Sequence, residues 1–182
     1  MRRTLLMVIL SMAALTSCGK KPLDHDTAMT MLRGRQFGTV QGKFSSTPGF
    51  VQFTGDNDGF SALTQLSQAN VILCQVDTCQ PGPAANGALQ GGGMGGFTYT
   101  AGTFVMGEVT GVTQPSPTTA VVEARIDFQP SPLYSQFRLV LDRLQTGKMV
   151  TGFQAEAPLS QQTQPRTERI QFQLFDNGWR AQ

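Results

Sequence analysis

Histidine is almost missing from this chain, since His25 is the only one among 182 residues. Catalysis by a Ser-His-Asp or Cys-His set needs a histidine held inside a fold, but His25 lies in a polar stretch near the start. We therefore expect His25 to be an exposed linker residue. The sequence also lacks the G-x-S-x-G and S-x-x-K motifs. A chain with these gaps is predicted to be a non-enzymatic protein without a metal or other cofactor.

Charged residues are also scarce, at 14% of the chain. Glu108, Glu123 and Asp127 are the carboxylates that might serve as an acid and a base, because glycoside hydrolysis uses two carboxylates across one bond. However, Glu123 and Asp127 share the polar face of one alternating segment, with Arg125 between them. Such a row of charges is typical of a solvated sheet face.

Long apolar runs are missing too. The longest, residues 5–15, is far short of the roughly 20 residues that a membrane-spanning helix needs. It follows Arg2 and Arg3 and fits the apolar core of a secretory signal. The next residues, Leu15-Thr16-Ser17-Cys18, resemble the lipobox of bacterial lipoproteins.

This resemblance implies that residues 1–17 are a signal peptide and that Cys18 receives a diacylglyceryl thioether, with further acylation of the new amino group. The membrane is then a partner through the lipid on Cys18, and residues 18–26 form a lipidated tether. Gly19 stands where an aspartate would retain the protein in the inner membrane. In a diderm the pattern therefore implies an outer-membrane lipoprotein facing the periplasm.

An excess of basic side chains is also lacking once the signal is removed. Loss of Arg2 and Arg3 leaves 12 basic and 12 acidic side chains. Binding to nucleic acid calls for a clustered basic surface, so no nucleic-acid partner is expected.

Only two cysteines remain after Cys18 is assigned to lipid. Cys74 and Cys79 are five positions apart in a chain expected to be exported, which predicts a disulfide between them. The alternative is a redox pair. Against it, the spacing is not C-x-x-C, and no Lys, Arg or His lies nearby to lower a thiol pKa.

Two segments have the outline of a ligand loop. Residues 56–59 resemble part of a calcium loop, but the flanking ligand positions are Thr54 and Gln65, which carry no carboxylate. A turn that caps the next helix is therefore favoured. Residues 91–96 are rich in glycine but lack the Gly-Lys-Ser/Thr ending of a phosphate loop, so a surface loop is expected there.

Periodicity predicts a single domain over residues 27–182, with a Gly/Pro-rich loop at 80–96 and a second exposed loop at 158–165. Short helices are expected at 27–35, capped by Asp26, and at 59–69. Strands are expected at 71–75, 103–112, 120–128, 137–142, 149–153 and 170–174, with bulges at Gly107 and Gly111. The predicted class is α+β, with two short N-terminal helices packed on a curved antiparallel β-sheet of four to six strands.

The end of the chain, Phe175-Asp176-Asn177-Gly178-Trp179-Arg180, follows a predicted strand. Together with the order of helices and then sheet, it resembles uncharacterised bacterial lipoproteins with a cystatin-like or NTF2-like sheet. Trp179, Phe175, Phe172 and Tyr134 are candidates to line a concavity, although such residues more often close a core.

These features predict a membrane-anchored lipoprotein of the cell envelope that acts as a non-enzymatic interaction or assembly module for another envelope protein. The alternative is a carrier of a small ligand or lipid that uses a cup under the sheet. A carrier should have a dry apolar cavity there. An interaction module should have a filled core and exposed apolar residues outside it.

Overall fold

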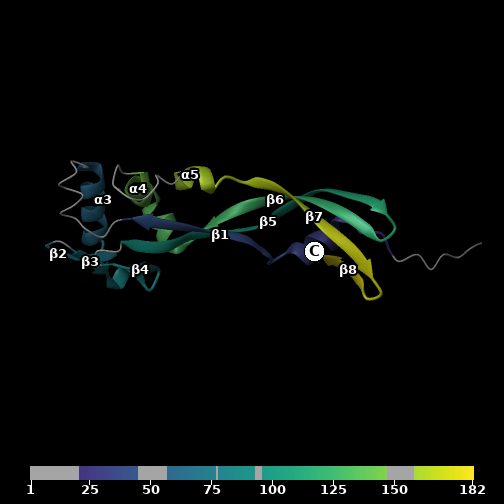
Figure 1. Cartoon of the computed structure of the whole chain (residues 1–182), viewed down its shortest axis with the longest axis horizontal. Coiled ribbons are helices and arrows are strands. Elements are labelled where there is room, and N and C mark those ends of the chain that lie inside the picture. The colour runs from purple at the N-terminus through teal and green to yellow at the C-terminus, as the bar shows by residue number, and fades with distance from the viewer. Residues whose placement is uncertain (1–20, 45–56, 77, 93–95, 147–157) are drawn as a thin grey trace, which may run out of the picture.

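The computed structural model describes residues 21–44, 57–76, 78–92, 96–146 and 158–182. The described part is α+β, with a curled antiparallel sheet that forms a half-barrel (Figure 1). This confirms the predicted class and the curved antiparallel sheet. In chain order the elements are α1 (His25–Leu32), β1 (Gln36–Phe44), α3 (Asn57–Gln68), β2 (Ile72–Gln75), β3 (Thr78–Pro81), the 3-10 helix η1 (Pro83–Ala85), β4 (Leu89–Gly91), β5 (Phe97–Ser116), β6 (Thr119–Pro130), α4 (Pro132–Thr146), α5 (Leu159–Gln162), β7 (Arg166–Phe175) and β8 (Gly178–Ala181).

The described strands form a six-stranded sheet and a separate hairpin. The sheet has the order β1, β5, β6, β7, β8, with β4 paired to one end of β5, and the hairpin joins β2 to β3. Strand β5 is 20 residues long and pairs with β1, β4 and β6. Its register with β6 shifts between Met106 and Glu108 and again between Val109 and Gly111. Extra residues of this kind bend a strand, so the bulges predicted near the glycines help the sheet to curl.

Alternation in β6 decides which face of the sheet is buried. Ala120, Val122, Ala124 and Ile126 are at most 1% exposed, as the alternating pattern predicts. Phe172 of β7 and Trp179 of β8 extend this apolar face. The residues between them on β6 point to the other face, and this face carries the charged side chains.

Helix α1 closes one end of the apolar face, where it contacts β5 and β8. Its N-cap is Asp24, whose side chain accepts a hydrogen bond of 2.7 Å from the Thr27 amide. The prediction of Asp26 as the cap was therefore wrong. The hydrogen bonds from Thr27, and then from Lys21, hold the pKa of the Asp24 carboxyl well below its usual range.

The folded part begins earlier than the tether prediction placed it. Leu23 is buried, and the Trp179 indole nitrogen donates a hydrogen bond of 3.0 Å to the Lys21 carbonyl oxygen. Residues 21–26 of the expected 18–26 tether thus belong to the fold, because their apolar and backbone groups pack against β8. Residues 18–20 lie outside the described part.

Helix α3 does not pack on the sheet as expected. Its main contacts are with α4 and β2, so only α1 of the two N-terminal helices lies against the sheet. The prediction of two N-terminal helices packed on the sheet is therefore not confirmed. Helix α3, α4 and the β2–β3 hairpin gather at one end of the molecule, while β8 lies toward the other end (Figure 1).

Helix α4 occupies the segment predicted as the strand at 137–142, so that prediction was wrong. Leu141 is fully buried whereas Leu139 is 75% exposed, which a strand with both leucines on one face does not allow. The apolar side chains that pack inward recur at helical spacing, at Leu133, Phe137, Leu141 and Leu144.

Two segments predicted as loops contain short regular elements. Residues 80–96 include η1 and β4, which pairs with β5. Residues 158–165 include α5, whose Leu159 is buried. The strand predicted at 149–153 lies outside the described residues.

Candidate protein-binding surface

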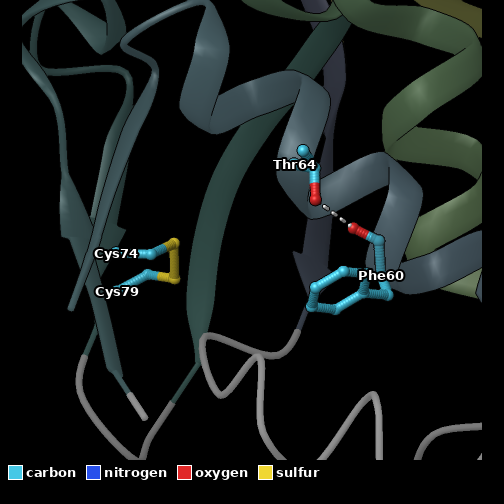
Figure 2. Close-up of a disulfide and its surroundings, with 4 residues drawn as sticks. All are labelled: Phe60, Thr64, Cys74 and Cys79. Carbon is cyan, nitrogen blue, oxygen red and sulfur yellow. Dashed lines mark hydrogen bonds between the residues drawn. A yellow bond between two sulfur atoms is a disulfide. The ribbon is translucent and has the colours of Figure 1, made fainter. Parts of the chain in front are cut away.

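The β2–β3 hairpin is closed by the predicted disulfide. Cys74 and Cys79 face each other across the two strands, with their Cα atoms 4.0 Å apart, and their sulfur atoms are bonded (Figure 2). The next pair, Gln75 and Thr78, ends the ladder just before the turn. The disulfide therefore holds the two strands together directly beneath that turn.

Val76 begins the turn and is the most exposed large apolar side chain of the described residues, at 92%. Its φ of +37° lies in the left-handed region, where glycine and asparagine are favoured. A β-branched side chain in this region is a backbone strain of about 1 to 3 kcal/mol. Val76 thus costs stability without burying its own apolar surface.

Two further exposed apolar side chains belong to elements at this end of the molecule, where α3 contacts β2. Leu73 of β2 is 48% exposed, and Phe60 of α3 is 39% exposed. Figure 2 shows Phe60 on the turn of α3 that faces the disulfide, one turn before Thr64, whose hydroxyl donates to the Phe60 carbonyl oxygen over 2.9 Å. Phe60, Leu73 and Val76 are the exposed large apolar side chains of α3 and the β2–β3 hairpin among the described residues, and we call the end of the molecule that carries them the distal surface.

The distal surface lies far from the point where the described chain begins. Lys21 is held beside Trp179 of β8, and His25 donates a hydrogen bond of 2.7 Å from Nε2 to the Val109 carbonyl oxygen of β5. Strand β8 and the hairpin are at opposite ends of the molecule (Figure 1). A domain attached through its N-terminus therefore presents the hairpin outward.

His25 is not the linker residue that the sequence suggested. It is the first residue of α1 and links this helix to β5. The Val109 carbonyl oxygen, and then the Asp26 carboxylate, raise the pKa of His25. Nothing in the local sequence identifies Val109 as its partner, because the two residues are 84 positions apart.

Two of the three carboxylates considered for catalysis, Glu123 and Asp127, are engaged by an arginine. Glu123 lies 2.8 Å from the Arg169 guanidinium on β7, and Asp127 lies 2.9 Å from that of Arg125. Glu108 is exposed on β5. The structure therefore does not assemble Glu123 and Asp127 into one acid and base pair. Within the described residues, no group of three or more His, Cys, Asp or Glu side chains has the geometry of a metal site.

The concave face of the sheet is filled rather than hollow at its α1 end. Leu32, Phe172 and Trp179 belong to the buried core, as does Tyr134 of α4. These aromatics therefore close a core, whereas Phe175 is 40% exposed and lies under the Arg180 guanidinium.

Two buried phenols lie near α4. Tyr134 donates a hydrogen bond of 2.9 Å to Asp142, and burial, followed by this bond, raises the pKa of Tyr134 to about 12. Burial also raises the pKa of Tyr99. The raised pKa values favour the protonated form of both phenols.

An open hollow of about 350 Å³ lies between the start of β1 and the edge of β7. Arg35 and Phe37 line it on one side and residues 168–171 on the other, with Gln182 also contributing. Its lining is mainly polar and charged. It therefore differs from the apolar cup proposed for a carrier.

Comparison with protein-family models, with curated proteins and with solved structures found no match for this chain. No helix in the described part of the chain has the length and hydropathy needed to cross a membrane. The signal at 1–17 and Cys18 lie outside the described residues. The lipobox and the cystatin-like or NTF2-like resemblance stay predictions from the sequence.

Sequence reasoning missed Val76, although a signal was present. The residues between Cys74 and Cys79 leave room for only a tight turn, and valine stands where such a turn favours glycine or asparagine. The disulfide was predicted, but the strained and exposed position that it imposes on Val76 was not. A β-branched residue in the turn of a disulfide-closed hairpin is thus a sequence pattern that points to an exposed residue with backbone strain.

Proposed function

We propose that this chain is an exported lipoprotein, anchored through lipid on Cys18, whose domain binds another protein of the cell envelope through the distal surface. The lipobox supports the anchor, and a net charge near zero after loss of the signal fits a protein partner better than a nucleic acid. The described chain begins at the end opposite the hairpin, which supports an orientation in which the distal surface points away from the membrane.

The strain and exposure of Val76 are the observation that carries this proposal. A side chain that costs backbone energy and remains 92% exposed gains nothing from its own fold. A contact with a partner would bury its apolar surface and offset that cost. Strain at a functional residue that the rest of the structure enforces, here through the disulfide, is a recurrent feature of binding sites.

Replacing Val76 by asparagine separates stability from binding. We expect Val76→Asn to raise the free energy of unfolding by about 1 kcal/mol, because asparagine tolerates positive φ. Capture of the partner should fall about tenfold, because an exposed apolar contact is lost. The measurements are chemical denaturation and quantitative co-purification from crosslinked native membranes, with a tag at the C-terminus.

Phe175→Gln is the matched control, since Phe175 is a partly exposed aromatic at the β7–β8 turn, away from the hairpin. It should leave partner capture unchanged. The proposal would be overturned if Val76→Asn captured the same protein in the same amount as the unmodified chain. Recovery of lipid alone, with no stoichiometric protein, would favour the carrier instead.

A further inference from the structure

The half-barrel leaves one edge of β7 unpaired among the described strands. Along Arg166–Gln173 this strand pairs with β6, but β8 covers its other edge only at Phe172–Phe175. The Gln182 amide extends this cover to the Gln171 carbonyl oxygen, so residues 166–170 have no backbone partner on their outer side within the described part. At about 3.4 Å per residue, this edge is roughly 17 Å long.

The backbone of β7 shows which groups face this edge. The Leu174 amide donates to the Thr118 carbonyl oxygen on the β6 side, whereas the Gln171 carbonyl oxygen accepts from the Gln182 amide on the opposite side. Alternate residues of a strand present their backbone groups to the same edge. Counting back from Gln171 in steps of two, Arg169 and Thr167 present their N–H and C=O groups outward.

The charged side chains of β7 do not repel an incoming strand, because they form ion pairs within the sheet. Arg166 pairs with Glu168 over 2.7 Å, and Arg169 pairs with Glu123 over 2.8 Å. The Arg166 guanidinium also donates to the Phe37 carbonyl oxygen, so it bridges β7 and β1 at one end of the hollow. Arg35 lies over the Phe37 ring, and none of the ion pairs among the described residues includes it.

We propose that the outer edge of β7 at residues 167–169 binds an extended segment of a partner protein, which adds to the sheet as a strand. A polypeptide is the fitting occupant because only its backbone supplies donors and acceptors at the repeat of Thr167 and Arg169. Arg35, across the hollow, selects an acidic side chain in that segment. This edge is separate from the distal surface, so it is a second binding site.

Proline at Thr167 tests the backbone step directly. The Thr167 amide faces outward, so Thr167→Pro removes one donor for the incoming strand without removing a hydrogen bond to β6. Peptides selected from a phage-displayed random library on the purified unmodified chain should bind Thr167→Pro about tenfold more weakly or worse, because a hydrogen bond is lost and the ring blocks the strand. Thr167→Ala, which keeps the amide, should bind them as the unmodified chain does.

Arg35→Gln supplies a second test that does not alter the strand. It should lower the affinity for peptides that carry glutamate or aspartate several-fold. The affinity for the same peptides with glutamine or asparagine at that position should not change. Val76→Asn should have no effect on these peptides, which distinguishes this site from the distal surface. Equal peptide binding by Thr167→Pro and Thr167→Ala, or failure to select any peptide, would overturn the proposal. Self-association of the chain that Thr167→Pro abolishes would also overturn it, since the occupant would then be a second copy.

Discussion

His25 links the first helix to the sheet through a hydrogen bond that is stronger when the imidazole is protonated. Its Nε2 donates to the Val109 carbonyl oxygen over 2.7 Å, and the Asp26 carboxylate lies 3.4 Å from its Nδ1. Both partners favour the protonated imidazole, so the pKa of His25 is raised in the folded protein. The link joins α1 to β5 near the point where the anchored chain would enter the domain.

A raised pKa gives this link a defined pH dependence. Its extra stability is fully present below the pKa of about 6.5 expected in the unfolded chain and is lost as the pH rises through the folded value. We expect the difference in free energy of unfolding between the unmodified chain and His25→Gln to shrink between about pH 5.5 and about pH 8.5. Chemical denaturation at several pH values measures it, and a difference that grows with pH would contradict the assignment.

Gly42 illustrates a second requirement at the scale of one residue. A Cβ atom added there would meet the ring of Tyr99, which lies directly over the β1 backbone. The sheet accommodates a buried tyrosine on β5 because its neighbour on β1, paired in register, has no side chain. A glycine in β1 thus has a packing role that its own strand pattern does not reveal.

Helix α4 covers the end of the sheet that lies next to the distal surface. It contacts β1 and β5 on one side and α3 on the other. The rings of Phe128 and Tyr134 pack edge to face, with an interplanar angle of 84°, at the corner where β6 leads into α4. This helix therefore connects the half-barrel to the element that carries Phe60.

Alanine variants of two leucines in α4 test whether this segment is a helix or the strand that alternation predicted. Leu141→Ala should lower the free energy of unfolding by about 3 kcal/mol, because Leu141 is fully buried. Leu139→Ala is the matched control and should cost less than about 0.5 kcal/mol, since Leu139 is 75% exposed. Thermal and chemical denaturation give both values. Similar losses for the two variants would instead fit a strand with both leucines on one face.

At the scale of the whole molecule, the described chain begins at one end and the disulfide hairpin lies at the other (Figure 1). Lys21 and α1 lie beside β8, while the disulfide hairpin and α3 lie at the opposite end (Figure 1). In the proposed orientation, lipid on Cys18 would hold the first end at the membrane and leave the distal surface free. The outer edge of β7 lies along the body between them.

Removal of Cys18 tests the anchor. We expect Cys18→Ala to move the protein from the membrane fraction to the soluble fraction, because each buried methylene of the acyl chains contributes about 0.8 kcal/mol to membrane binding. Detergent-phase partitioning and intact mass of the isolated protein are the measurements. A Cys74→Ala/Cys79→Ala double variant should partition as the unmodified chain does. An unmodified mass at Cys18 in the membrane-bound protein would rule out the lipid.

Local periodicity was sufficient for part of the fold and part of the site. The alternation of β6 and β7 and the bulges of β5 predicted the curved antiparallel sheet, and the spacing of Cys74 and Cys79 predicted the disulfide of the separate β2–β3 hairpin. These features depend on neighbours in sequence or on the apolar face of one strand. Residues 137–142 failed because a short alternating run also fits part of a helix period, and burial of Leu141 without Leu139 follows from packing on the sheet.

The sequence by itself determined the class of the fold, the disulfide pairing and the prediction of a lipid anchor, since each is written in residues close together in the chain. Only the tertiary structure decided the surroundings of His25, Val76 and the β7 edge. The partner of His25 is 84 positions away, the exposure of Val76 depends on what surrounds the hairpin, and an edge is free only where another strand ends. These relations join residues that are distant in sequence, so no local sequence pattern encodes them.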